Sequence, residues 1–349
     1  MSATLPLNGN DSGAEPRLTK ADFQSDQETR WCPGCGDYAI LNAVQTLMPE
    51  LGVPTEKTVF VTGIGCAGRF AYYMDTYGMH SIHGRATAIA TGLATTREDL
   101  SIWVVSGDGD ALSIGGNHLI HALRRNVPLK ILLFNNQIYG LTKGQASPTS
   151  ERGKITKSTP FGSHDRPFNP IALALGAEAS FVARTLDRDR KHMTDVLRAA
   201  ANHRGASLVE IYQNCPVFND GAFFPLTEKD TKVQMQIRLQ HGEPIRFGPD
   251  GSRGVARAAD GGLEIVEVVD AGEDALLVHD QHREDPSLAF ALARLADRPT
   301  EPTPIGIFRQ VERPIHGAAA SQNPDRAIGD VGSLHGLLHA GDTWTVTGA

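Results

Sequence analysis

The chain has 349 residues, with 33 Lys and Arg against 40 Asp and Glu and a formal net charge of −7. This length provides one large domain or two small ones, and a mildly acidic chain lacks the positive charge that drives general nucleic-acid binding. No apolar run reaches the length of a membrane span, and the polar N-terminus holds no signal-peptide core, so we expect a cytoplasmic protein without a membrane partner.

The cysteines are the first unusual feature along the chain. Residues 1–27 are polar and without periodicity, which predicts a flexible tail. Cys32 and Cys35 then form a Cys-Pro-Gly-Cys pair, and Cys66 and Cys215 stand alone far downstream. Four thiols with one such pair indicate a metal or redox site. The alternative is one reactive pair together with two buried structural thiols.

Hydrophobic periodicity predicts an α/β protein. Helical spacing of apolar residues predicts helices over 37–48, 116–126, 171–175, 190–203 and 287–296. Short apolar runs predict strands over 58–62, 101–105, 129–134, 207–212, 263–269 and 275–279. Strands alternating with helices indicate a parallel sheet with helical crossovers. The unpatterned stretch 144–170 is expected to be a functional or mobile loop.

Four predicted strands end in segments with chemically distinctive residues. Residues 63–68 follow the first and contain Cys66, and Asp108 stands between two glycines after the second. Asn136 follows the third strand and Cys215 the fourth. Because ligands gather beyond the carboxyl ends of parallel strands, we expect these segments to form one composite site.

Gly107-Asp108-Gly109, followed by Asn135-Asn136, resembles the diphosphate motif of thiamine-diphosphate enzymes. Glycines let the backbone approach phosphate oxygens, and an Asp carboxylate is a hard oxygen ligand for Mg²⁺. The resemblance implies a Mg²⁺ ion held by Asp108, the Asn136 side chain and the Ile138 carbonyl. The alternative is an ordinary turn, because a lone Gly-Asp-Gly is common at turns.

Several motifs then occur in order, and together they indicate a family. They are Trp31-Cys-Pro-Gly-Cys35, Gly63-Ile-Gly-Cys66, Ile82-His-Gly-Arg-Ala86, the run 107–117, the run 138–145 and Asn214-Cys-Pro216. This series resembles the beta subunit of 2-oxoacid:ferredoxin oxidoreductases, most closely the 2-oxoglutarate enzymes. The resemblance covers roughly residues 25–310. It implies a thiamine-diphosphate-binding fold, a parallel sheet with helices on both faces and a small C-terminal extension.

The resemblance also implies the domain organisation and a metal cluster. We expect the tail 1–27, a thiamine-diphosphate-binding domain over 28–232, the extension over 233–313 and a second tail over 314–349. In the family four cysteines hold one 4Fe–4S cluster, which implies Cys32, Cys35, Cys66 and Cys215 here. A zinc-stapled, non-catalytic subunit is the alternative, although structural zinc sites usually pair two Cys-x-x-Cys knuckles.

The implied activity is CoA-dependent oxidative decarboxylation of 2-oxoglutarate to succinyl-CoA and CO₂, with electrons passed to ferredoxin. Two alternatives remain, a pyruvate or broad-range 2-oxoacid enzyme and a non-oxidative thiamine-dependent lyase. Thiamine enzymes also need a glutamate on a pyrimidine-binding domain, and this chain resembles only the diphosphate-binding half. We therefore expect an alpha subunit carrying that glutamate, in an alpha–beta heterodimer or its dimer.

The site residues follow from these motifs. Those expected to contact the cofactors are Ile64, Gly65, Cys66, His83, Gly107, Asp108, Gly109, Asp110, Asn136, Ile138, Leu141 and Thr142. The alternative for Asp110 is a carboxylate at a helix N-terminus. Lys143 and Arg69 are the candidate cations for a substrate carboxylate. Their alternatives are a solvated loop lysine and an arginine that caps a turn.

Overall fold

One large sheet organises the part of the chain that the computed structural model describes, which is residues 18–296, 301–317, 334–339, 341–342 and 344–346. Among these residues the sheet has eight strands. Their order is β2 (Tyr77–His80), β1 (Thr58–Thr62), β3 (Ser101–Gly107), β4 (Lys130–Asn135), β6 (Ser207–Tyr212), β5 (Phe181–Leu186), β11 (Thr303–Gln310) and β7 (Gln236–Leu239).

The sheet is parallel with one exception. From β2 to β5 every neighbouring pair is parallel, and β11 also runs parallel to β7, but β11 is antiparallel to β5. The four strands predicted to carry the site are β1, β3, β4 and β6, and they are consecutive neighbours. The expected parallel α/β sheet is therefore confirmed, and its site-bearing ends share one edge.

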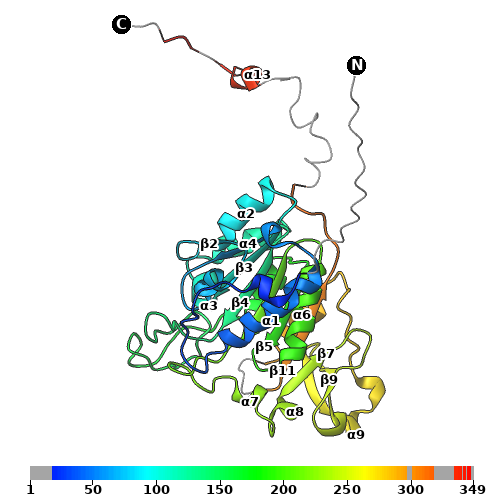
Figure 1. The fold of residues 1–349 in the computed structure, drawn as a ribbon. Helices are drawn as coiled ribbons and strands as arrows, with labels where there is room; N and C mark the ends of the chain where they lie inside the picture. Colours follow the sequence, from blue (N-terminus) through cyan, green and yellow to red (C-terminus); the bar gives the residue numbers. More distant parts are fainter. Residues whose placement is uncertain (1–17, 297–300, 318–333, 340, 343, 347–349) are drawn as a thin grey trace, which may run out of the picture.

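Helices cover both faces of the sheet because its strands alternate apolar residues between two cores. Ile102 and Val104 of β3 face one core, and Trp103 and Val105 face the other. The first core is covered by α2 (Ala86–Thr96), α4 (Gly116–Arg124), α5 (Pro170–Gly176) and α10 (Ser287–Ala293). The second is covered by the 3₁₀ helix η3 (Ala67–Tyr73), α1 (Asp37–Leu51) and α6 (Arg190–Asn202). Figure 1 shows α1 and α6 side by side in front of the sheet.

A small antiparallel sheet lies beside β7 (Figure 1). It is formed by β8 (Arg246–Phe247), β9 (Arg253–Arg257) and β10 (Leu263–Glu267). The short helices elsewhere are α3 (Asp108–Leu112), α7 (Phe224–Thr227), α8 (Lys232–Met235), α9 (Val268–Ala271) and α13 (Leu334–Leu338). The expected strand over 275–279 is wrong, because Leu276 and Val278 form only isolated bridges to different partners.

The terminal segments contribute more to the fold than their composition indicated. β7 and β11 belong to the expected extension 233–313, yet both pair within the main sheet. At the other end, Phe23 is completely buried and Gln24 bridges to Met74, so this end of the expected tail packs on the domain. Residues 1–17 of that tail, and most of 314–349, lie outside the described residues. The division into domains stays a prediction.

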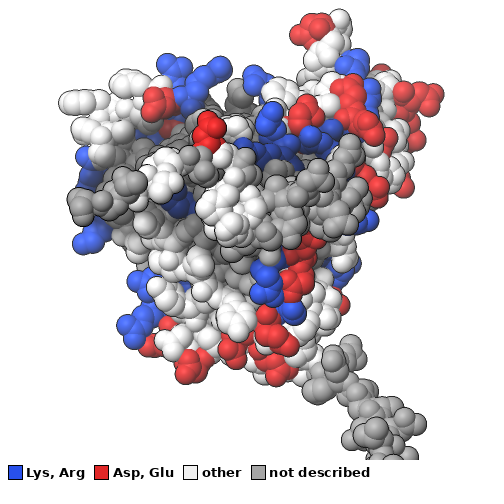
Figure 2. Space-filling model, turned by 90° about the horizontal axis from the view of Figure 1, so that it is seen from above, with Lys and Arg blue, Asp and Glu red and all other residues white. Residues whose placement is uncertain are grey.

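The surface carries charged side chains of both signs, in agreement with the composition. On the face seen in Figure 2, acidic and basic side chains are interspersed around the described part of the molecule. Within the described ranges, no helix has both the length and the apolar character needed to cross a bilayer.

A buried ion pair joins the neighbouring strands β5 and β6. Arg184 Nε donates to Glu210 Oε2 at 2.7 Å, and the two side chains are 4% and 0% exposed. The guanidinium also lies 5.0 Å from the centre of the Tyr212 ring. Removing one member of such a pair leaves the other charge buried and uncompensated.

We expect Arg184→Met to lower the free energy of unfolding by about 3 kcal/mol, because it leaves the Glu210 carboxylate buried without an oppositely charged partner. The measurement is urea unfolding followed by circular dichroism. Arg198→Met is the control, because the ion pairs of Arg198 with Glu50 and Asp195 are exposed and such pairs contribute less than about 1 kcal/mol. Equal losses in the two variants would contradict the prediction.

Candidate active site

A cavity of about 450 Å³ lies beyond the carboxyl ends of the central strands. Its walls contain every one of the cofactor-binding residues expected from the sequence, from Ile64 at the end of β1 to Thr142 after β4. Cys66 belongs to the same wall, so the cysteine region and the Gly-Asp-Gly turn share one space. The geometry thus gathers these residues, and their individual binding roles stay predictions.

Asp108 is a buried carboxylate in the wall of this cavity. β3 ends at Gly107, and Asp108 begins α3 with an exposed fraction of 2%. Ser147 Oγ donates to Asp108 Oδ2 at 2.5 Å, and Thr149 Oγ1 lies 2.5 Å from the same oxygen. Burial raises the pKa of Asp108 to about 6, and these two hydroxyls oppose the shift. A buried carboxylate held in place by hydroxyls is well suited to a hard cation.

Asn136 and Ile138 form the turn after β4 that faces Asp108 across the cavity. The Asn136 Oδ1 atom accepts from the Ile138 backbone N–H at 3.1 Å, which closes the turn. Between them Gln137 takes a left-handed backbone with φ of 57°. Both Asn136 and Ile138 line the cavity with Asp108. The donor set is therefore a carboxylate, an amide and a backbone carbonyl, all of them oxygen ligands of the kind Mg²⁺ prefers.

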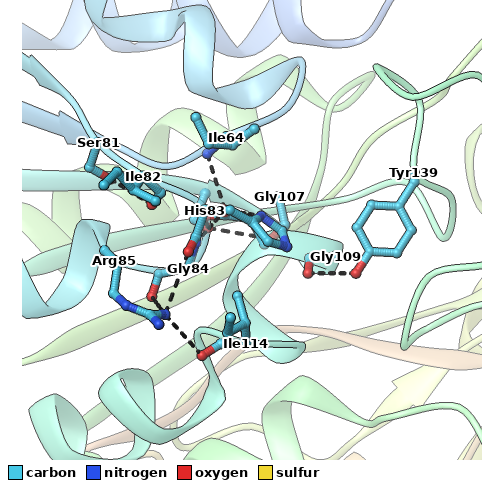
Figure 3. Close-up of polar contacts among 12 residues, drawn as sticks. Ile64, Ser81, Ile82, His83, Gly84, Arg85, Gly107, Gly109, Ile114 and Tyr139 are labelled. Carbon is cyan, nitrogen blue, oxygen red and sulfur yellow. Dashed lines mark hydrogen bonds and ion pairs between the residues drawn. The ribbon is translucent and has the colours of Figure 1, made fainter.

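Asp110 is a buried carboxylate of the cavity wall that contacts several other segments of the chain. Its Oδ1 accepts from the backbone N–H groups of Ile64 and Gly84 at 3.1 and 2.7 Å. His83 Nδ1 lies 2.8 Å from the same oxygen, and Ser106 Oγ donates to Oδ2 at 2.5 Å. Figure 3 shows Ile64, His83 and Gly84 converging on this point from two separate segments. The carboxylate of Asp110 thus fixes the loop after β1 to the His83 segment.

Two glycines leave room that side chains would fill. A Cβ at Gly109 would lie 2.3 Å from the Tyr139 ring, whose hydroxyl donates to the Gly109 carbonyl at 2.9 Å (Figure 3). Gly84 has φ of 69°, and a Cβ there would lie 2.6 Å from the Gly115 nitrogen. The close approach of Tyr139 to Gly109 therefore requires that Gly109 has no side chain.

The four cysteines come from three loops that are tied together. Trp31 Nε1 donates to the Cys66 carbonyl at 2.8 Å, and the Gly36 N–H donates to the Asn214 carbonyl at 3.2 Å. A Cβ at Gly140 would be 3.5 Å from Cys66 Sγ and 3.7 Å from Cys215 Sγ. The cysteines are free, and among the described residues no group of three or more Cys, His, Asp and Glu stands close enough to hold one metal ion.

Burial favours the protonated form of two of these thiols, Cys35 and Cys66, in the absence of a cation. It raises the pKa of Cys66 to about 12, and it raises the pKa of Cys35 further, with the Asp37 carboxylate adding to both effects. Converging sulfur donors that resist ionisation on their own bind as thiolates when a metal or cluster compensates the charge. The chemistry of this donor set is therefore compatible with an iron–sulfur cluster or another thiophilic metal centre.

Several residues in or next to the cavity escaped the sequence analysis. Asp37 lines the cavity, and neither of its oxygens has a hydrogen-bond partner among the described residues. Burial raises its pKa to about 7. The position two residues after Cys35 was a signal for Asp37, and Ser147 and Thr149 lie within the loop 144–170 that we expected to be functional. Gln213 directly follows β6, next to the Cys215 motif, which also marked its position.

The two candidate substrate cations lie apart from the main cavity wall. Arg69 lines a neighbouring cavity of about 470 Å³, which shares Ile64, Gly65 and Leu141 with the first. Lys143 is exposed and has φ of 75°, so the turn holds it in a left-handed backbone. Neither cation is among the residues of the first cavity.

Comparison with known proteins first shows the class of enzyme domain to which this chain is similar. Residues 63–211 match the family model described as the thiamine pyrophosphate enzyme, C-terminal TPP binding domain. This match includes β3 and β4 and the whole Asp108 and Asn136 region. The chain thus contains the diphosphate-binding domain of thiamine enzymes, as the Gly-Asp-Gly motif indicated.

Individual relatives then define the family. The 2-oxoglutarate oxidoreductase subunit KorB of Mycobacterium tuberculosis is 57% identical over 98% of this chain and 96% of its own length. The 2-oxoacid:ferredoxin oxidoreductase subunit beta of a Sulfolobus species is 47% identical over 54% of this chain and 63% of its own length. The chain belongs to the beta subunits of 2-oxoacid:ferredoxin oxidoreductases, KorB-like, and the family predicted from the motifs is confirmed.

A solved structure agrees with this assignment. The 2-oxoglutarate:ferredoxin oxidoreductase from Magnetococcus marinus, solved with 2-oxoglutarate, coenzyme A and succinyl-CoA bound, superposes with a TM-score of 0.73 at 33% identity. The match covers 94% of this chain and 97% of that one. The similarity extends well beyond the diphosphate-binding domain, since it includes the segments on both sides of it.

We expect Gly109→Ala to lower the free energy of unfolding by about 1–3 kcal/mol, because the new methyl group overlaps the Tyr139 ring. Gly92→Ala is the matched control. Gly92 lies in α2 with open space around its Cβ position, so there alanine should stabilise the protein by about 0.5–1 kcal/mol. Thermal unfolding of both variants checks the prediction, which requires effects of opposite sign.

Proposed function

We propose that this chain is the beta subunit of an enzyme that converts 2-oxoglutarate and CoA to succinyl-CoA and CO₂ and passes the electrons to ferredoxin. The observation that carries the proposal is the shared cavity wall. Asp108 and Asn136 offer the oxygen ligands of a metal–diphosphate site, and Cys66 lies in the same cavity. A non-oxidative thiamine lyase has no use for thiols beside its cofactor.

Asp108, Asn136 and the Ile138 carbonyl would hold Mg²⁺ and, through it, thiamine diphosphate. When bound, this cofactor supplies the electron sink for loss of CO₂ from a 2-oxoacid. Ser147 and Thr149 keep Asp108 in one orientation, and Asp110 holds the loop of Ile64 against the His83 segment. The buried position of Asp108 excludes water from its carboxylate and so favours a cation there.

Cys32, Cys35, Cys66 and Cys215 would hold one 4Fe–4S cluster. Oxidation after CO₂ loss proceeds by single-electron steps and needs an acceptor close to the thiamine site. Cys66 supports a cluster close to the thiamine site, because it lines the same cavity as Asp108. Single zinc is less well supported, since structural zinc sites usually pair two Cys-x-x-Cys knuckles and this sequence has one. Reduced thiols of this kind also favour a cytoplasmic setting.

An alpha subunit would supply the pyrimidine-binding glutamate and complete the site. The rim near the cavity is apolar and exposed, with Ile82 75% and Ile114 52% exposed. At the sheet edge, all four residues of β2 are exposed, including Tyr77 and Met79. Exposed apolar side chains on an unpaired edge strand are features of a protein interface. These surfaces support an obligate alpha–beta assembly, from which ferredoxin accepts electrons.

The decisive test uses the chain purified without oxygen together with its alpha partner. We expect about four irons and four sulfides per beta chain, with a visible absorbance that bleaches when 2-oxoglutarate and CoA are added. Bleaching follows from electron transfer into the cluster. Zinc in place of iron, or a cluster that does not respond to substrate, would overturn the proposal and leave a non-oxidative thiamine enzyme.

Asp108→Asn is the matched variant for this experiment. The substitution keeps the size of the side chain and removes the charge that would hold the metal. We expect it to retain iron and sulfide but to lose the bleaching by substrate, since none of the cysteines has been changed. Loss of the cluster itself would show that Asp108 acts on folding rather than on the cofactor.

Substrate choice is tested at Arg69 and Lys143, since a second carboxylate distinguishes 2-oxoglutarate from pyruvate. A charged hydrogen bond contributes about 1.5–3 kcal/mol, so the variant that removes the true partner should lower kcat/KM for 2-oxoglutarate about tenfold or more relative to pyruvate. The measurement compares both substrates in Arg69→Met and Lys143→Met. Lys157→Met, at an exposed lysine of the loop 144–170, is the control.

A further inference from the structure

Gln213 is a buried amide placed between the two halves of the site. It follows β6 directly, is 1% exposed and lines the main cavity. Its backbone N–H donates to the Asn135 carbonyl at 3.0 Å, which continues the pairing of β6 with β4. The backbone that carries this side chain is therefore held in place by the sheet.

The side chain of Gln213 contacts both candidate cofactor sites at once. Its Oε1 accepts from Asn136 Nδ2 at 2.9 Å, and its Nε2 donates to Cys35 Sγ at 3.2 Å and to the Asn214 carbonyl. Gly36 makes room for it, because a Cβ at Gly36 would lie 2.9 Å from Gln213 Cγ. One amide thus connects a predicted Mg²⁺ ligand with a predicted cluster ligand.

The direction of these hydrogen bonds is fixed at both ends. The Ile138 backbone N–H can only donate, so the oxygen of Asn136 faces it and the Asn136 NH₂ group faces Gln213. The Asn214 carbonyl can only accept, so the NH₂ group of Gln213 faces it and Cys35. The chain of donors therefore runs from Asn136 through Gln213 to the Cys35 sulfur.

We propose that Gln213 is a positioning residue that couples the metal–diphosphate site to the iron–sulfur cluster, an inference that rests on the proposed function. A donor to a ligand sulfur stabilises the reduced cluster and raises its potential. A cation on Asn136 Oδ1 makes the Asn136 NH₂ group a stronger donor, and polarisation along the chain strengthens the bond from Gln213 to Cys35. Cofactor binding therefore makes the cluster a better electron acceptor.

The test is a redox titration of the cluster, followed by electron paramagnetic resonance, in the alpha–beta complex with and without Mg²⁺ and thiamine diphosphate. Gln213→Met keeps the volume and removes both contacts. We expect the equilibrium constant for reduction of the cluster to fall about tenfold in this variant, which lowers the reduction potential by about 59 mV for one electron. We also expect the shift on adding the cofactors to be smaller than in the wild type. Gln236→Met is the matched control, because Gln236 is a buried amide of β7 that donates to the Leu226 carbonyl.

Gln213→Glu separates the two contacts. It keeps an oxygen for Asn136 and removes the amide donor to Cys35, so the cluster potential should fall while the affinity for thiamine diphosphate stays near that of the wild type. The inference about Gln213 would be overturned, and the proposed function left standing, if the cluster were intact and had the same potential in the wild type, Gln213→Met and Gln236→Met. A wild-type complex without four irons and four sulfides would overturn the proposed function as well.

Discussion

The parallel alignment of β1, β3, β4 and β6 is the constraint on which the rest of the site depends. Four neighbouring strands that run in one direction must deliver their following loops to one edge of the sheet. Each loop then needs only one or two distinctive residues. Cys66, Asp108, Asn136 and Cys215 are 149 positions apart from first to last, yet the sheet order makes them neighbours. A non-polar interior on both faces keeps this edge rigid.

Buried carboxylates give the same edge its electrostatic character. Asp110 accepts hydrogen bonds from protein donors, so its charge organises the loops around it. Asp108 is held by the hydroxyls of Ser147 and Thr149, and Asp37 receives no hydrogen bond among the described residues. Three carboxylates within one cavity therefore differ in how far their burial is offset by the protein. We expect the cation at Asp108, because the further oxygen donors of Asn136 and Ile138 line the same cavity.

The parts of the fold and of the site that could be predicted are those whose residues form a pattern within a short stretch of sequence. A run such as 101–105 is apolar on both faces because it is buried on both, and the Gly-Asp-Gly that follows it is contiguous in sequence. The strands that were missed lack that pattern: β2 is exposed throughout, and β5 contains Arg184, whose charge is offset only by Glu210 on β6. The antiparallel strand β11 reaches β5 from over a hundred residues away, and no local signal encodes such a pairing.

The same distinction explains which site residues sequence reasoning missed. Asp108 and Asn136 belong to a sequence motif. The side chains of Ser147, Thr149 and Gln213 instead contact residues that are distant in the sequence and that only the fold brings close. Gln213 shows why this matters for the chemistry. Asn136 and Cys35 are 101 positions apart, and each belongs to a recognisable motif for a different cofactor. The residue that joins them belongs to neither motif, because its contribution is to hold two sites in one hydrogen-bonded arrangement. Communication between cofactors thus depends on residues that no cofactor motif contains.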